Sequence, residues 1–301
     1  MANVFIQPSV VAKMALANLY ANSVMLPLVH RDYSNDFVQG AGDTITIRKP
    51  TTFTAQDFTS AIVIQDIAET SVPVVMNYHK DISVSIGAKE AALDLKDFQE
   101  QVISPAMEAI SQAVDEDILT FRDDLVQEVG TNGATTTGVS GTNSWDADNP
   151  RVLIDAKRVL NTRKVPDSER YAVVGPTTAA KWEGDDLLTK ANDRGDIVGR
   201  EEAYLGKRLF GFSPYETQHV DGGDDEINVA FHRTAVAFVT RPLVLPRGAA
   251  AAEQISYKGV GMRVVYSYDA TAKKDIMSMD LIYGVKCLDP NRAVLITANA
   301  S

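Results

Sequence analysis

The sequence predicts an α+β fold, in which helices and strands occupy largely separate stretches of the chain. Residues 44–48 (TITIR) alternate between polar and apolar side chains, as in a strand with one buried face. Apolar residues between 88 and 129 recur every three or four positions, which is the period of a helix face. Further apolar runs predict strands towards the C-terminus, at 262–268, 276–286 and 294–297.

Composition limits the classes of protein to which the chain can belong. It has 301 residues, of which 45% are apolar and 23% charged, and its formal net charge is −11. This length leaves room for about two domains of ~150 residues. The one cysteine, Cys287, excludes a disulfide framework, and the acidic balance argues against nonspecific nucleic-acid binding. Lys13 interrupts the N-terminal apolar stretch and no window resembles a membrane helix, so we expect a soluble, intracellularly made protein.

A short helix is predicted near the N-terminus, on an otherwise extended arm. It begins at Pro8 and Ser9, and Pro27 with the polar segment 31–35 ends it. Its apolar positions follow helical spacing: Val11, Ala15, Leu16 and Leu19.

Residues 43–86 are predicted to form one long two-stranded excursion. The strand 44–48 follows a turn signal at 40–43, and further β-like tracts lie at 62–64 and 72–86. Residues 51–60 would form a polar, mobile tip. Because a lone hairpin is marginally stable in water, we expect this one to lie on something else.

The longest helical signal spans 88–129. Pro105 lies inside it, and a proline within a helix costs roughly 3 kcal/mol, so we expect a break there. Ser104 would be the N-cap and Pro105 the first helical residue, while Glu108 is one place late for a capping box. The helix from 105 to 129 would then have about 25 residues and a length of ~37 Å.

The Gly/Thr/Ser/Asn-rich segment 130–144 is a loop and the best candidate for a domain boundary. A helix follows it, capped by Asp148 or Asn149, with Pro150 in its first turn. The later elements are expected in this order: strand 170–174, helix 177–182, then strands 209–215, 228–231, 235–240, 262–268, 276–286 and 294–297.

Motifs of catalysis or metal binding are missing from the sequence. The tract GFSPY at 211–215 lacks the last glycine of a nucleophile elbow. GKR at 206–208 and GVG at 259–261 lack the other residues of a P-loop and of a dinucleotide fingerprint. The histidines have no metal-ligand spacing and are predicted to be surface or interface residues: His30, His79, His219 and His232.

The acidic clusters are predicted to be solvated. DGGDDE at 221–226 favours a turn over a calcium site because it lacks the spacing of an EF-hand loop. Asp115-Glu116-Asp117 and Asp123-Asp124 favour an exposed helix face over a paired-carboxylate site. RGD at 194–196 is a chance tripeptide, and Cys287 is expected to be a buried small hydrophobe. The sequence therefore predicts no catalytic, cofactor-binding or metal-binding residues, no cofactor, and no enzymatic activity.

Several segments, spread over nearly the whole chain, resemble one protein family in the same order. They are HRDYSNDFVQGAGDTITIRKP (30–50), ISPAMEAISQAVDEDIL (103–119), VPDSERYAVVGPTTAAKW (165–182), VAFHRTAVAFVTRPL (229–243) and IMSMDLIYGVKCLDPNRAVLI (276–296). The chain resembles the major capsid (coat) protein of tailed bacteriophages, with the Hong Kong 97-type fold. Among these it is similar to the short-tailed-phage coat-protein branch, without the extra inserted domain.

The resemblance implies a division of the chain into four parts. Residues 1–40 would be the N-terminal arm, and 41–87 the extended loop that lies on a neighbouring subunit. The peripheral domain, with its long spine helix, would combine 88–129 with about 241–286. The axial domain would combine 130–240 with about 287–301.

The resemblance also implies a structural function. The chain would be a virion subunit that self-assembles into the hexamers and pentamers of an icosahedral shell, locked non-covalently around double-stranded DNA without sequence-specific binding. Assembly in the bacterial host cytoplasm would involve a scaffolding protein, a portal protein and possibly a decoration protein, and no membrane. An encapsulin-like nanocompartment shell around a cargo enzyme is the alternative with the same fold. A soluble hydrolase is disfavoured because no nucleophile–base arrangement is found.

Overall fold

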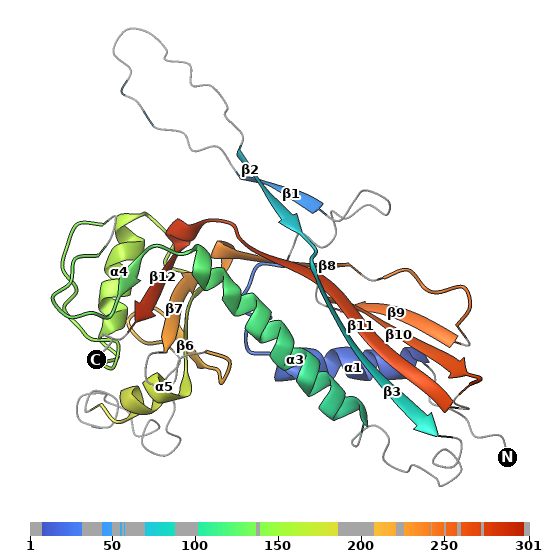
Figure 1. The fold of residues 1–301 in the computed structure, drawn as a ribbon. Helices are drawn as coiled ribbons and strands as arrows, with labels where there is room; N and C mark the ends of the chain where they lie inside the picture. The colour runs from blue at the N-terminus through green and yellow to red at the C-terminus, as the bar shows by residue number, and fades with distance from the viewer. Residues whose placement is uncertain are drawn as a thin grey trace.

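Two five-stranded sheets and a two-stranded ribbon form the framework of the described part of the chain in the computed structural model (Figure 1). The structure describes residues 8–31, 44–49, 55, 57, 70–87, 102–136, 139–185, 208–220, 226–241, 243–249, 251–257, 260–271 and 274–297. Helices accompany both sheets, and the ribbon extends away from them (Figure 1). The α+β class predicted from the sequence is confirmed.

The first sheet is antiparallel and centres on the long strand β11. Its members are β3 (Tyr78–Gly87), β8 (Val236–Arg241), β9 (Ala251–Tyr257), β10 (Val260–Asp269) and β11 (Lys274–Cys287). Alternate residues of β11 are buried on one face: Met277, Met279, Leu281 and Tyr283. The strands expected at 235–240, 262–268 and 276–286 are confirmed. β9 was not expected, because Ala, Glu and Gln are weak strand formers.

Helix α1 (Pro8–Asn22) packs against helix α3 (Ser104–Leu119) and against β9 and β10. Its apolar positions are fully buried in the core that it shares with these elements: Val11, Ala12, Ala15, Leu16 and Leu19. The predicted N-terminal helix is confirmed. The burial of this part of the arm comes from its own chain rather than from a neighbour.

The expected helix from 105 to 129 is too long. α3 ends at Leu119, a 3₁₀ turn η3 (Thr120–Asp124) follows, and the chain then enters the short strand β4 (Glu128–Val129). Leu125 and Val129 are buried from an extended backbone, so apolar spacing alone could not locate the helix end. Ser104 is not the N-cap either, because Ile103 takes that position with helical dihedral angles. The part of the signal from 88 to 101 lies outside the described residues.

The second sheet has the strand order β4-β12-β7-β5-β6. Its other strands are β12 (Ala293–Thr297), β7 (Ile227–His232), β5 (Arg170–Val174) and β6 (Ser213–Glu216). Helices α4 (Val152–Thr162) and α5 (Pro176–Glu183) share its apolar core, in which Trp182 is fully buried. The elements expected at 170–174, 177–182, 228–231 and 294–297 are confirmed. The strand expected at 209–215 is shorter, because Leu209 and Phe212 close a tight turn before β6.

The ribbon consists of β1 (Thr44–Lys49) and β2 (Thr70–Val75), paired antiparallel. β3 follows after Met76 and Asn77 and pairs with β11, so the ribbon strand continues into the first sheet. The expected two-stranded excursion over 43–86 is confirmed at 44–49 and 70–75, which form the ribbon, and is wrong at 78–86, which belongs to the first sheet. The tract 62–64 and all of the expected tip except residues 55 and 57 lie outside the described residues.

Candidate functional site

The base of the ribbon has one covered face and one uncovered face. Ile47 and Val74 are buried in a small apolar cluster with Ala237, Val239 and Leu288, which anchors the ribbon on β8 and the end of β11. On the opposite face, side chains lie exposed to solvent: Thr44, Thr46, Ser71, Pro73 and Val75. Nothing in the described chain covers this face, so the ribbon can contact another molecule there.

Close backbone packing fixes the point at which the ribbon leaves the first sheet. Gly284 in β11 lies so close to β2 that a Cβ atom on it would sit 2.3 Å from the Val75 carbonyl oxygen. No side chain fits in such a gap. The ribbon therefore rests directly on the backbone of the first sheet.

An aromatic stack next to this point links the ribbon's base to α3. The Tyr283 ring lies between those of Tyr78 and Phe238, with centroid distances of 5.4 and 5.3 Å. The Tyr283 hydroxyl donates to a carboxylate oxygen of Asp117, and Lys80 Nζ lies 2.8 Å from the same carboxylate. Burial, and next the hydrogen bond to Asp117, raise the pKa of Tyr283. The sheet and α3 are thus tied together where the ribbon begins.

Asp115 corrects the expectation of a solvated acidic face on α3. It is only 1% exposed and accepts hydrogen bonds from Ser23 Oγ, the Val24 amide and the Met25 amide, at 2.5, 2.8 and 3.2 Å. These donors lie just after α1, so Asp115 joins the end of α1 to α3. Burial raises its pKa, against the opposing effect of the Ser23 and backbone hydrogen bonds. Asp117 is also paired, with Lys80, whereas Glu116 is mostly exposed.

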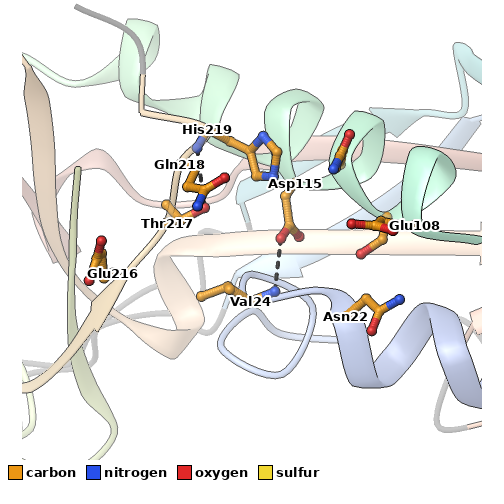
Figure 2. A pocket seen from close by; sticks show the side chains of 10 residues that line it. Asn22, Val24, Glu108, Asp115, Glu216, Thr217, Gln218 and His219 are labelled. Atoms are coloured by element: carbon orange, nitrogen blue, oxygen red, sulfur yellow. Dashed lines mark hydrogen bonds between the residues drawn. The ribbon is translucent and has the colours of Figure 1, made fainter. Parts of the chain in front are cut away.

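A polar cavity of about 560 Å³ opens beside Asp115, between α1, α3 and the segment after β6 (Figure 2). His219 lies over α3 there, with its Nδ1 3.6 Å from Glu116 Oε1. No lysine or arginine is among the described residues that line the cavity, which are Asn22, Val24, Glu108, Ser111, Gln112, Asp115, Glu216, Thr217, Gln218 and His219.

The other histidines have structural surroundings. His30 bonds through its backbone to Val236 and Phe238, and His79 Nε2 lies 3.2 Å from Asp280. His232 is only 4% exposed, which corrects the expected surface position. Burial, and next the charge of Arg292, lower its pKa.

The acidic turn expected at 221–226 is also corrected at its last residue. Glu226 is buried, and its carboxylate accepts hydrogen bonds from the Thr177 and Thr178 amides at the start of α5, both at 2.8 Å. Burial would raise the pKa of Glu226, but the hydrogen bonds from Thr178 and Thr177 outweigh it and lower the pKa. A carboxylate in this position complements the exposed amides of a helix N-terminus. Residues 221–225 lie outside the described part.

The described part of the loop 130–144 is held by α4. Asp155 accepts from the Ser144 and Trp145 amides, and Arg158 donates to the Ser140 carbonyl oxygen at 2.9 Å. Gly141 adopts a φ of +128° with its Cα beside the Arg158 guanidinium, a conformation that disfavours any other residue. This loop is therefore ordered by named contacts, although the sequence predicts it only as a boundary.

The described residues contain no group of three or more His, Cys, Asp or Glu side chains placed to hold a metal ion. Cys287 is buried, as predicted. The RGD tripeptide and the glycines of GKR and GVG lie at 194–196, 206, 259 and 261, of which only 261 is described. No helix in the described chain is long and apolar enough to cross a membrane.

Comparison with known proteins was made at three levels. No protein-family model matches the chain, and no curated protein sequence is significantly similar to it. Solved structures do match. A structure of Mycobacterium phage Che8 has a TM-score of 0.62 and 21% identity, covering 91% of this chain and 90% of that chain. The capsid structure of the cyanophage P-SCSP1u has a TM-score of 0.60 and 16% identity, covering 87% and 85%.

A weaker similarity is to the holo-SrpI encapsulin complex from Synechococcus elongatus. Its TM-score is 0.52 at 8% identity, with coverage of 85% of this chain and 81% of that chain. The phage structures therefore match better than this encapsulin. The chain has the fold of tailed-phage capsid subunits, the Hong Kong 97-type capsid fold.

Proposed function

We propose that the chain is a major capsid subunit, which self-assembles into the hexamers and pentamers of an icosahedral shell around double-stranded DNA. The observation that carries the proposal is the similarity of fold to a phage capsid structure over more than four fifths of both chains. Fold alone does not determine function, so the proposal also rests on the ribbon with its uncovered face. An open strand pair of this kind is expected to be covered by a partner.

The parts of the subunit are assigned on the same basis. The first sheet with α1 and α3 would be the peripheral domain, in which α3 is the described part of a spine helix. The second sheet with α4 and α5 would be the axial domain, whose tip would meet its copies at the capsomer centre. The ribbon would lie on a neighbouring subunit, as the extended loop. Because β8 pairs within the first sheet, we would put the change of domain at about 235 rather than at about 240.

A nanocompartment shell around a cargo enzyme is the second candidate, favoured by the encapsulin similarity but at the lower TM-score. The content of the particles distinguishes the two. Particles from the native source should contain double-stranded DNA in the first case and a protein cargo in the second. In either case the chain would be structural rather than catalytic. As a phage capsid subunit it would be located in the virion.

The test is to express the full chain, alone and together with any scaffolding-protein candidate found among its genome neighbours, and to examine the products by electron microscopy. Closed shells or ring-shaped capsomers are expected. Genome neighbours of the portal and packaging-motor class would support the phage assignment. A chain that stays monomeric under every assembly condition would contradict both candidates.

A further inference from the structure

The cavity beside α3 has an unusual balance of charge. Glu108, Asp115 and Glu216 supply three carboxylates to its lining, and neither lysine nor arginine is present among the described lining residues. Its volume, about 560 Å³, lies within the range of roughly 300–1,000 Å³ that is usual for small-molecule sites. His219 also lines the cavity.

Two of these carboxylates are available to a ligand. Asp115 already accepts hydrogen bonds from Ser23, Val24 and Met25. Glu108 and Glu216 are exposed to solvent and form no ion pair with any described residue. They come from α3 and β6, so they face the cavity from two different elements (Figure 2).

Ser111 is a second and independent observation. It lines the cavity from α3, three positions after Glu108 and four before Asp115, so the three share one helix face. It is only 2% exposed, and its hydroxyl makes no hydrogen bond with any residue in the described chain. The hydroxyl oxygen is not fully enclosed, so it reaches the cavity, where a bound donor would meet it.

We propose that this cavity binds an organic cation through ammonium or guanidinium groups, with Glu108 and Glu216 supplying the negative charge and Ser111 a buried acceptor. Both groups carry several N–H donors and match a lining of carboxylate, amide and hydroxyl oxygens. The side-chain amides of Asn22, Gln112 and Gln218 and the Thr217 hydroxyl supply further acceptors. The proposal does not depend on shell formation.

Two probes distinguish the sources of such a cation: spermidine for a free polyamine, and N-acetylarginine amide for a protein side chain. Each is titrated into the purified full chain by calorimetry, at an ionic strength held constant with sodium chloride. Saturable binding of one cation per chain is expected for at least one probe. Binding of spermidine alone identifies a polyamine site, binding of the arginine derivative alone identifies a side-chain site, and binding of both identifies the shared chemistry.

Variants locate the binding. Glu108→Gln and Glu216→Gln should each weaken it roughly tenfold, as expected for the loss of one charge-assisted hydrogen bond. Ser111→Ala should weaken it about threefold, since it removes one neutral acceptor. Asp123→Asn is the matched control, because Asp123 is an exposed carboxylate on η3 and does not line the cavity. The proposal is overturned if neither probe saturates, or if Asp123→Asn weakens binding as much as Glu108→Gln. Electron microscopy of the same variants reports separately on shell formation.

Discussion

At the scale of single residues, several acidic side chains that the sequence predicts to be solvated instead connect distant parts of the fold. Asp115, Asp117 and Glu226 each accept a hydrogen bond from a residue far away in the chain. The sequence shows only that acids cluster locally, and neighbours in sequence do not reveal a donor about 90 residues distant. Some of the carboxylates that contribute to the net charge of −11 are therefore buried inside the fold.

Asp115 and Glu226 should give opposite pH dependences of stability. The pKa of Asp115 is raised above its ordinary value of 3.8, so its contribution to folding is full below that value and is lost as pH rises through the folded-state pKa. The pKa of Glu226 is lowered from 4.5, so its contribution is present above pH 4.5 and is lost as pH falls through the folded-state pKa.

Urea unfolding of Asp115→Asn, Glu226→Gln and the unaltered chain between pH 7 and pH 4 tests this contrast. At pH 7 the free energy of unfolding of each variant should be about 1–3 kcal/mol lower than that of the unaltered chain, because buried donors lose their charged acceptor. As the pH falls towards 4, the difference in the free energy of unfolding between the unaltered chain and Asp115→Asn should grow. The same difference for Glu226→Gln should begin to shrink. Deficits that change in the same direction would show that the two carboxylates do not have the environments described.

At the scale of elements, local patterns located most helices and strands but not their ends or partners. The alternation in 44–48 predicted β1, and the predicted helix after the loop exists as α4, but its N-cap is Arg151 rather than Asp148 or Asn149. Helical spacing continued past Leu119 because Leu125 and Val129 are buried from an extended backbone, which the sequence does not distinguish from a helix. The polar cavity could not be predicted either, since it combines α1, α3 and the segment after β6.

Gly284 is expected to set the position of the ribbon. In Gly284→Ala the new methyl group would overlap the Val75 carbonyl, so β2 must shift, at a cost of roughly 1–3 kcal/mol in the free energy of unfolding. Hydrogen exchange at Val74 and Val75 should accelerate, and assembled shells should become fewer. Gly248→Ala is the matched control, because a Cβ atom there meets nothing within 4 Å. Equal behaviour of the two variants would refute the close approach.

Arg158 is expected to order the loop before α4. Arg158→Ala removes donors to Ser140 and Asn143, so amides at 134–136 and 139–143 should exchange faster while those of the first sheet do not change. Lys157→Ala changes the neighbouring residue on the same helix, beside Gly211 rather than the loop, and should leave the amides at 134–136 and 139–143 protected. Native-state hydrogen exchange with mass spectrometry compares them. Unchanged protection in Arg158→Ala would mean that other contacts order the loop.

At the scale of the whole molecule, a chain with its own core carries a ribbon whose outer face is covered by none of the residues that the structure describes. α1 lies in that core, so the share of the chain that depends on neighbours for burial is smaller than the sequence suggested. The acidic excess fits a shell whose inner wall repels packaged DNA rather than binding it, a hypothesis that requires the excess to lie on that wall. In the proposed capsid subunit, assembly would then depend on the ribbon more than on net charge.

Deleting residues 51–62 should separate folding from assembly. The strands β1 and β2 remain joined by a shorter connection, and shortening a loop two- to threefold changes the free energy of closing it by only about 1 kcal/mol. The two sheets make none of their described contacts through these residues, so circular dichroism and the unfolding midpoint should stay close to those of the full chain. Electron microscopy should show few or no closed shells, because the segment that would lie on the neighbouring subunit is gone. Normal shells from the deleted chain would show that assembly relies on other surfaces, whereas loss of the unfolding transition would show that the deletion damaged the subunit itself.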